Sequence, residues 1–578
     1  PEKSKLIADG RTRPAIAVRI LDRAIRPAHA GLSGDFQISA PYESAEALDA
    51  MQSRALTGLD RLSPRWTVKG DDGIALIKLA PTLVSGALQL DFTFTDGQQK
   101  RRQTLNAWVV PGDQKWTLVG LAEGSLGAKT IANTMQRTGR IDSNLGQHAR
   151  VAFYAKGKVP GSALLTIAYD SGKQRDDQQL LGAIDPRAYY TVFADGSSRR
   201  FDAASRNKLY VRIESRAFYA LFGDFETGFN DTQLARYQRI ATGVKGEARI
   251  GSFHAQGFAT RVASMHHQDE IQGGGISGPY PLSSKAIIAN SEIVTLETRD
   301  RFRSEVIVDT KTLTRFIDYD IDLLAGTITF KSPVLSRDFN QNPVFIVVDY
   351  EIDRNASGGE LNAGARVDFT SASGGVRIGA TAISDTGNGP RTQLGGLDVK
   401  ARVASGTEVR AEVAASRDLG NTKTAWLAEI EHHDGRLDIL GYARSMDSGF
   451  GVGQSTGAEQ GRRKYGIDAR YLVNENLSLV GSGWIDDSLT DATHRNAVQL
   501  HAQYRDGQNT FIAGVSMLRD RLANGTIAPS TTLDGGVTRQ MFGGRLEEDA
   551  TSSVGLGQTQ SVDLLVREQF SLRYALNS

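Results

Sequence analysis

The chain has 578 residues, with 67 Lys and Arg against 66 Asp and Glu, and it contains 61 Gly, 15 Pro and no Cys. The near-zero net charge provides no global field that would attract nucleic acid or an acidic partner. The lack of Cys excludes disulfides, zinc–thiolate sites and cysteine nucleophiles. No run approaches the roughly 18–20 apolar residues that a transmembrane helix needs.

The first region, residues 1–112, has short apolar segments separated by Gly and Asp turns. They are Leu6–Gly10, Ala15–Asp22, Asp72–Pro81 and Ser85–Phe94. Short strands at this spacing are typical of a β-sandwich. We therefore predict that residues 1–112 form a separate sandwich domain.

Three motifs in this region carry a family resemblance. The first strand contains Ala8-Asp9-Gly10, the second motif keeps Pro27 but has Ile25 where glycine is usual, and a late strand starts at Gly86. At these residues the region resembles the bacterial immunoglobulin-like repeat of invasin and intimin type surface proteins. The resemblance implies a spacer or display domain and no chemistry.

Residues 113–275 and 357–578 show a repeated two-residue alternation. Leu397, Val399, Ala401 and Val403 alternate with charged residues, as do Val409, Ala411 and Val413 on the following segment. Successive side chains of a strand point to opposite faces, so each segment has an apolar face and a charged face. Lipid outside and water or ion pairs inside match this pattern, which predicts an antiparallel transmembrane β-barrel in two parts.

The alternation breaks between residues 276 and 356, where Asn, Pro and Asp interrupt the strand-like segments. We predict a β-rich insert, either extramembrane or lumenal. The stretch Arg315–Phe330 resembles an element of large Gram-negative surface and outer-membrane proteins. Aromatic residues and arginines dominate binding hot spots, so the insert supplies the candidate partner-binding residues, unless its aromatics form its own core. The candidates are Tyr280, Arg303, Phe316 and Tyr319.

Phe570, Leu572, Tyr574 and Leu576 alternate like a barrel strand, and the chain then stops at Ser578. The terminal strand of many outer-membrane barrels ends on an aromatic residue. The second part of the barrel, 357–578, is therefore expected to be truncated at its C-terminus.

The sequence contains no convincing catalytic, cofactor or metal motif. The acidic series that begins at Asp318 has Leu323 and Thr329 where a calcium loop needs Gly and Glu. Gly273–Gly278 satisfies the G-x-G-x-x-G pattern, but Pro279 follows and forbids the helix that a dinucleotide site requires. We expect no enzyme activity, no cofactor and no metal site.

Charged residues in the polar phase of the barrel strands form the one constellation with functional promise. Opposite charges on neighbouring strands pair readily and would fill and stiffen the barrel, whereas a water-filled conduit is the functional interpretation. Evenly mixed signs favour ion-paired filling. The candidate lumen-lining residues are Arg366, Asp368, Arg377, Asp398, Lys400, Arg402, Arg410, Glu412, Asp468 and Arg470.

The sequence as a whole predicts an all-β protein of the cell outer membrane: a sandwich, then a barrel with an insert. The first functional hypothesis is a barrel that anchors and displays extramembrane β-domains at the cell envelope. One alternative is a channel or translocation pore gated by the insert, and another is a soluble secreted β-sandwich adhesin. The expected partners are outer-membrane lipid and envelope or surface proteins or polysaccharides, with no nucleic acid.

Overall fold

In the computed structural model, the described residues run from 6 to 574 with interruptions, the longest of which are residues 50–63, 125–148 and 172–207. The described part is β-strand and turn almost throughout, which confirms the all-β prediction. It contains no helix with the length and apolar character needed to cross a membrane. The strands group into an N-terminal unit, a barrel wall and an insert.

Twenty antiparallel strands form the barrel wall. They are β8 (Thr117–Gly124), β9 (Ala149–Val159), β10 (Ala163–Asp170), β11 (Leu209–Glu214), β12 (Phe218–Glu226), β13 (Ile240–Ile250), β14 (Phe253–Val262), β22 (Glu360–Thr370), β23 (Val376–Asp385), β24 (Thr392–Ala404), β25 (Thr407–Asp418), β26 (Asn421–His433), β27 (Leu437–Met446), β28 (Arg462–Leu472), β29 (Leu477–Ser488), β30 (His494–Asp506), β31 (Asn509–Arg521), β32 (Ile527–Met541), β33 (Leu546–Thr559) and β34 (Arg567–Tyr574). Each strand pairs with its neighbour in the chain, except that β14 pairs with β22 across the insert. The strand order is that of a closed barrel, with β34 as the neighbour of β8.

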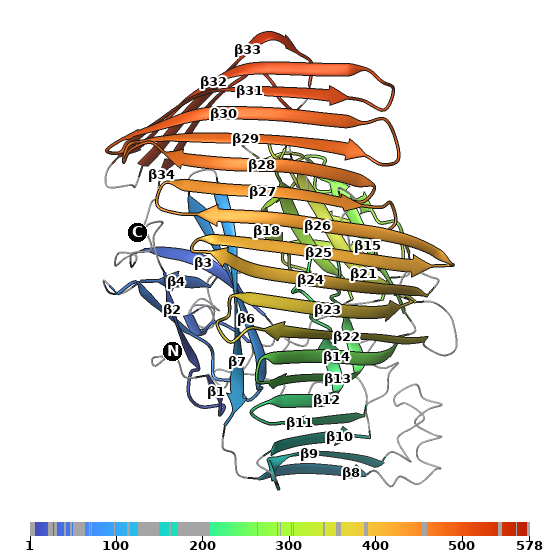
Figure 1. Cartoon of the computed structure of the whole chain (residues 1–578). Helices are drawn as coiled ribbons and strands as arrows, with labels where there is room; N and C mark the ends of the chain where they lie inside the picture. Colours follow the sequence, from blue (N-terminus) through green and yellow to red (C-terminus); the bar gives the residue numbers. More distant parts are fainter. Residues whose placement is uncertain are drawn as a thin grey trace.

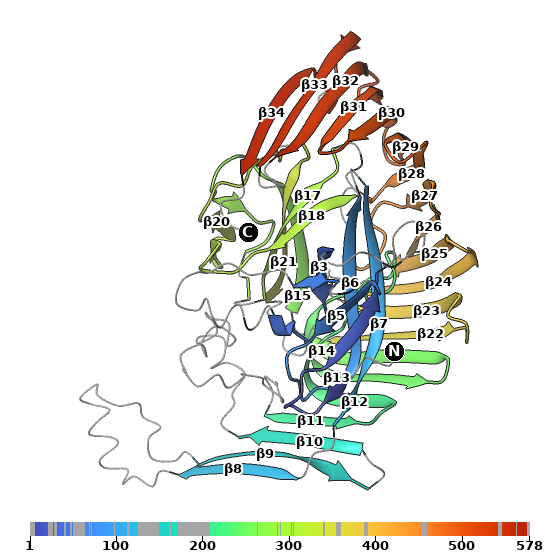
Figure 2. The ribbon, with the colours of Figure 1, turned by 90° about the vertical axis from the view of Figure 1, so that its left-hand side faces the viewer.

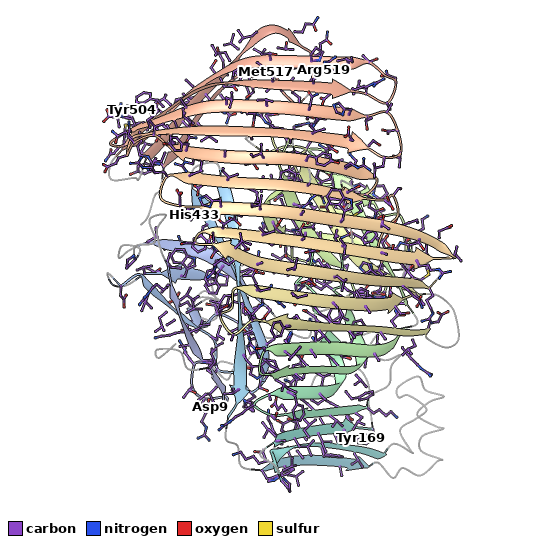
Figure 3. The ribbon with its side chains drawn as sticks, in the orientation of Figure 1. Asp9, Tyr169, His433, Tyr504, Met517 and Arg519 are labelled. Atoms are coloured by element: carbon purple, nitrogen blue, oxygen red, sulfur yellow. The ribbon has the colours of Figure 1, made fainter. Side chains whose placement is uncertain are left out.

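The two faces of the wall differ as the alternation predicts. Val367, Leu397 and Val413 lie on the outer face with 49%, 60% and 53% of their surface exposed. On β22 the residues that flank Val367, Arg366 and Asp368, point inward and are buried. The end of β31 departs from this rule: Met517 and Arg519, labelled in Figure 3, are both exposed, while the apolar Leu518 between them is buried.

The N-terminal unit consists of two small sheets around one core. The larger sheet has the order β1 (Ile7–Ala8), β7 (Gln99–Pro111), β6 (Gly86–Asp96), β3 (Ser33–Ile38) and β4 (Arg65–Thr67), and the smaller pairs β2 (Ala15–Arg19) with β5 (Ile74–Lys78). Phe36, Leu88 and Leu90 are buried between them. This arrangement is a two-sheet packing, and its assignment to the immunoglobulin-like family stays a prediction.

The insert also has its own core. One sheet has the order β15 (Ser264–Gln272), β21 (Val344–Asp353), β17 (Ile293–Arg299) and β18 (Ile307–Thr312), and the other has β16 (Tyr280–Pro281), β20 (Thr327–Phe330) and β19 (Tyr319–Asp322). Ile328, Ile346 and Val348 are fully buried in it. Because β15 pairs with β21, the insert's sheet begins before residue 276, the boundary predicted from the break in alternation.

The wall curves around the N-terminal unit and the insert. Figure 1 shows the wall strands running side by side from β8 in teal to β33 in red, with the blue N-terminal unit beside them. Figure 2, turned by 90°, shows that the wall is curved and that both the N-terminal unit and the insert lie on its concave side. The concave side is therefore the inner face of the barrel, and it carries two folded bodies.

Candidate functional site: the inner face of the barrel and the bodies on it

The centre of the inner face is an ion-pair network on β22, β23 and β24. The Arg366 guanidinium donates to both carboxylate oxygens of Asp398, at 2.7 and 3.0 Å, and to the Thr381 hydroxyl at 2.8 Å. The Arg377 guanidinium donates to Asp368 Oδ1 at 3.0 Å. The two parallel N–H···O bonds orient the Arg366 guanidinium on Asp398, and the carboxylate neutralises its charge.

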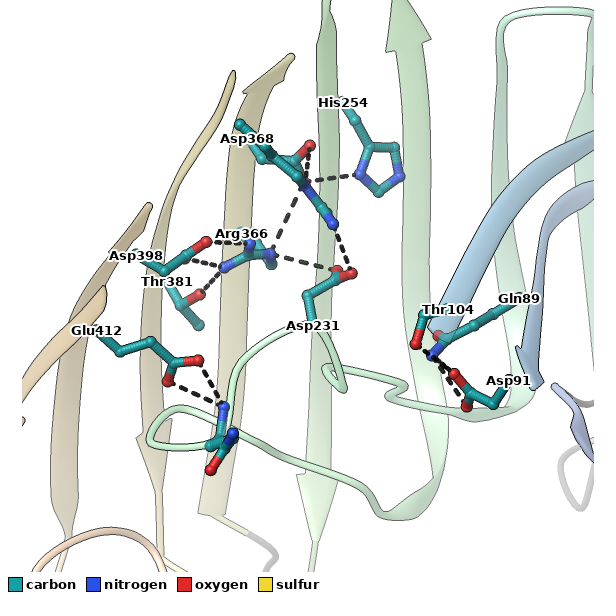
Figure 4. Close-up of polar contacts among 12 residues, drawn as sticks. Gln89, Asp91, Thr104, Asp231, His254, Arg366, Asp368, Thr381, Asp398 and Glu412 are labelled. Carbon is teal, nitrogen blue, oxygen red and sulfur yellow. Dashed lines mark hydrogen bonds and ion pairs between the residues drawn. The ribbon is translucent and has the colours of Figure 1, made fainter. Parts of the chain in front are cut away.

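A loop between β12 and β13, residues 227–239, folds inward onto this network. Its Asp231 forms ion pairs with Arg366 at 3.4 Å and with Arg377 at 3.1 Å, as Figure 4 shows for Arg366. The backbone N–H groups of Gln233 and Leu234 donate to Glu412 at 2.9 Å. The loop thus narrows the space inside the wall. We call it the infolded loop.

Apolar and aromatic contacts hold the base of the infolded loop. Phe229 and Tyr237 are 1% exposed, and both rings pack on Phe258 of β14 at 5.4 Å between centroids. The Tyr237 hydroxyl donates to Asp385 Oδ1 at 2.7 Å. Burial of two whole aromatic rings makes this loop part of the protein's core.

Ion pairs attach the insert to the wall at both of its ends. At the near end, Arg239 of the infolded loop donates to Glu351 of β21 at 2.6 Å and to Asp385 of β23 at 3.0 Å. One guanidinium therefore joins the loop, the insert and the wall. All three side chains are largely buried, so the pair is screened little by salt.

At the far end, two arginines of the insert reach across to other strands. Arg303 pairs with Asp468 of β28 at 2.5 Å and lies over the Trp484 ring of β29 at 5.5 Å. Arg337 pairs with Asp563, which lies between β33 and β34, at 3.0 Å. Asp563 in turn accepts from Arg495 of β30 at 2.6 Å.

The structure places the predicted lumen-lining residues on the inner face, most of them in ion pairs. Lys400 pairs with Glu408 at 3.0 Å, and Arg410 with Glu431 at 3.3 Å. Arg402 stands opposite Glu408, and Arg470 opposite Asp438, in the strand register. The interpretation as ion-paired filling fits these contacts, and Asp468 in addition receives the insert.

The predicted partner-binding residues are split by the structure. Tyr280 and Tyr319 are buried in the insert's own core, so they are unavailable to a partner. Phe316 is half exposed, and Arg303 is engaged by Asp468. The hot-spot interpretation is therefore wrong for the two tyrosines, because the insert needs their rings to complete a small core.

The structure adds functional candidates that sequence reasoning missed. His254 of β14 bridges Glu247 at 2.8 Å and Asp368 at 3.1 Å, and Asp231 ties the infolded loop to the wall. Neither residue has a motif around it, and only the polar phase of the strand could have pointed to His254. Among the described residues no group of three His, Asp or Glu side chains is arranged to hold a metal ion.

Comparison with known proteins finds only distant similarity. No family model and no curated protein matches the chain. Among solved structures, the outer membrane protein OpdK from Pseudomonas aeruginosa is 9% identical and covers 67% of this chain and 90% of its own, with a TM-score of 0.27. OccK9 (OpdG) of the same organism is 12% identical, covering 71% and 91%, with a TM-score of 0.28. A BenF-like porin from Pseudomonas fluorescens Pf-5 is 8% identical, covering 71% and 91%, with a TM-score of 0.27. Overlap this low carries no argument about the chain, whose function has to be inferred from its own geometry.

Proposed function

We propose that this chain is a non-enzymatic outer-membrane barrel that forms a gated passage for a polar solute or polypeptide, with the insert as its gate. The observation that carries the proposal is the ion pairing of a separately folded insert to the inner face, through Arg239, Arg303 and Arg337. This is the channel alternative of the sequence analysis. It takes precedence over the anchor and display hypothesis.

The outer face supports the membrane location. Val367, Leu397, Val413 and Trp426 are exposed and lie in one row across β22 to β26, with Ala380 of β23 between the first two. A contiguous belt of exposed apolar side chains across several strands is rare on soluble proteins. A closed antiparallel barrel with such a belt satisfies its backbone internally, which the hydrocarbon region requires.

The inner face supports a passage over a solid anchor. Cross-strand pairs such as Arg366–Asp398 neutralise the charges of the wall. An anchor would therefore not need a folded domain inside the barrel to neutralise these charges. The insert has a complete core and meets the inner face at β28 and near β33 through the Arg303 and Arg337 pairs. Because these pairs hold only its far end, that end can come off the wall while the insert and the wall stay folded.

Removal of the insert is the first test. Val262 at the end of β14 stands opposite Glu360 at the start of β22, so residues 263–359 can be replaced by Asn-Gly, the preferred two-residue hairpin turn. We expect the shortened chain to assemble with heat-modifiable gel migration and to conduct in planar bilayers far more than the intact chain. If neither chain conducts, and a chain that also lacks residues 1–112 does not conduct either, the anchor and display role is favoured.

The Arg303–Asp468 pair gives a finer test. Arg303→Gln and Asp468→Asn should each raise the open fraction, and the double substitution should add little, because both remove the same contact. Lys331→Gln is the matched control, since Lys331 pairs with Asp320 within the insert, and both side chains are about half exposed. Equal effects of Arg303→Gln and Lys331→Gln would contradict the gate.

A soluble adhesin is the remaining alternative. Folded membrane barrels migrate faster on gels before heating, whereas sandwich arrays generally do not. Purification of the intact chain as a monodisperse monomer without detergent would reject the membrane location, and with it the proposed passage.

A further inference from the structure

The turn that leads into β6 of the N-terminal unit is docked on the inner face of the wall. The Ser85 hydroxyl donates to Glu214 Oε2 of β11 at 2.7 Å. Arg212 of the same strand donates to the Ser85 carbonyl oxygen and pairs with Glu214 at 2.8 Å. The side chains of Arg212 and Glu214 are 6% and 0% exposed, so the docked turn seals them from solvent.

Three further contacts surround this polar centre. Lys156 of β9 donates from Nζ to the carbonyl oxygen of Leu83 at 3.1 Å. Gly86 lies against the Tyr219 ring of β12, where an added Cβ would come within 3.0 Å of the ring. The Trp108 ring of β7 packs on the same Tyr219 at 6.4 Å between centroids. We call the contacts of Leu83, Ser85 and Gly86 with β9, β11 and β12 the latch.

The latch joins two bodies that are otherwise complete. The N-terminal unit has its own core, and its two sheets are separate from the sheet of the wall. Within the wall, Arg212 and Glu214 are already paired with each other. Undocking the turn would therefore expose an intact ion pair to the lumen, and water would replace the hydrogen bonds that the turn supplied.

One hydrogen-bond acceptor of the wall is unsatisfied while the latch is closed. Among the described atoms, Glu214 Oε1 is buried and has no hydrogen-bond partner. A buried carboxylate oxygen without a partner is costly, and hydration on opening would satisfy it. Several contacts therefore stabilise the closed latch, while the unsatisfied Glu214 Oε1 favours opening.

We propose that the N-terminal unit is a second plug of the barrel, held on β9, β11 and β12 by the latch and released from it as a folded body. The inference rests on the proposed passage and deepens it. The two plugs are attached at different strands, because the far end of the insert is held at β28 and near β33. Each should therefore open without the other.

The test uses the absence of cysteine from the chain. Ser85→Cys and Glu214→Cys are introduced together, and a short thiol crosslinker that reductant cleaves joins the two bodies. The background is the chain in which Asn-Gly replaces residues 263–359, so that the insert no longer blocks the lumen. We expect the crosslinked protein to be locked closed and the reduced protein to conduct.

A matched crosslink separates docking from chemical modification. Asp91→Cys with Thr104→Cys joins β6 to β7 inside the N-terminal unit, where Thr104 donates to Asp91 at 2.5 Å (Figure 4). This control should leave conductance unchanged. In the uncrosslinked background, Arg212→Gln should raise the open-to-closed ratio roughly tenfold, the change expected when one charge-assisted hydrogen bond is lost.

The outcomes distinguish this inference from the proposed function. If the insert-free chain conducts equally with the Ser85–Glu214 crosslink intact and cleaved, the second plug is wrong while the passage stands. Failure of that pair to crosslink would also overturn the latch. If removal of residues 1–112 together with the insert still gives no conductance, the passage itself is wrong. Should Arg212→Gln lose heat-modifiable migration, the crosslink comparison decides alone.

Discussion

An arginine in the middle of the outer belt should destabilise the barrel strongly. Val413 lies near the centre of β25, is 53% exposed, and stands between Leu397 of β24 and Trp426 of β26 in the register. Val413→Arg places a charge where the proposed hydrocarbon midplane lies. Such a substitution costs about 2–4 kcal/mol in a membrane barrel.

An outward residue nearer the end of a strand, and so nearer the membrane interface, provides the control. Val403 has the same outward phase and is 62% exposed, but it lies at the end of β24 beside the turn into β25. Val403→Arg should cost only about 0–1 kcal/mol, because its guanidinium reaches the interface. A difference of about 2–3 kcal/mol corresponds to a factor of roughly 30–150 in the unfolding equilibrium constant.

The assay is equilibrium unfolding in urea with the protein folded into phospholipid vesicles, followed by heat-modifiable gel migration. We expect the midpoint to fall much further for Val413→Arg than for Val403→Arg. Equal costs below about 1 kcal/mol for both would mean that Val413 faces water. That result would refute the assignment of the outer face.

Two further substitution pairs test the wall. Arg366→Gln leaves Asp398 and Asp231 without their buried guanidinium and should lower the free energy of unfolding by about 3 kcal/mol in the same assay. Arg391→Gln breaks an exposed pair with Glu360 and should lower it by less than about 1 kcal/mol. Similar costs for the two variants would mean that the Arg366 network is hydrated. Gly406 has φ +77, and an added Cβ would lie 2.1 Å from the His433 carbonyl oxygen, while Gly374 has φ +69 with open space around it. Gly374→Ala should therefore cost about 1–2 kcal/mol and Gly406→Ala distinctly more, measured by the same urea midpoints; the reverse order would contradict the packing of the β24–β25 turn.

The sequence by itself determined that the wall is built of alternating strands, and for strands such as β24 and β25 it determined which face is apolar. The reason is local: alternation along a strand follows from the backbone, and lipid on one side imposes it on every strand such as β24 and β25. That regularity placed Arg366, Asp398 and Glu412 on the inner face without any knowledge of their partners. The same local signal located the insert only by the loss of alternation, so its boundary at 276 missed β15.

Tertiary structure alone decided what occupies the inner face. Ser85 meets Glu214, and Arg303 meets Asp468, across more than a hundred residues of chain, and neither pair leaves a periodic trace in the sequence. The infolded loop carries a single Asp231 whose role depends on two arginines of other strands. Burial of Tyr280 and Tyr319 was likewise open in the sequence, because an aromatic side chain suits a core and a binding surface equally well. Alternation reflects the environment on each side of a strand, which is a local property of the sequence. Docking depends on which distant surfaces the fold brings together, and only the folded chain contains that information.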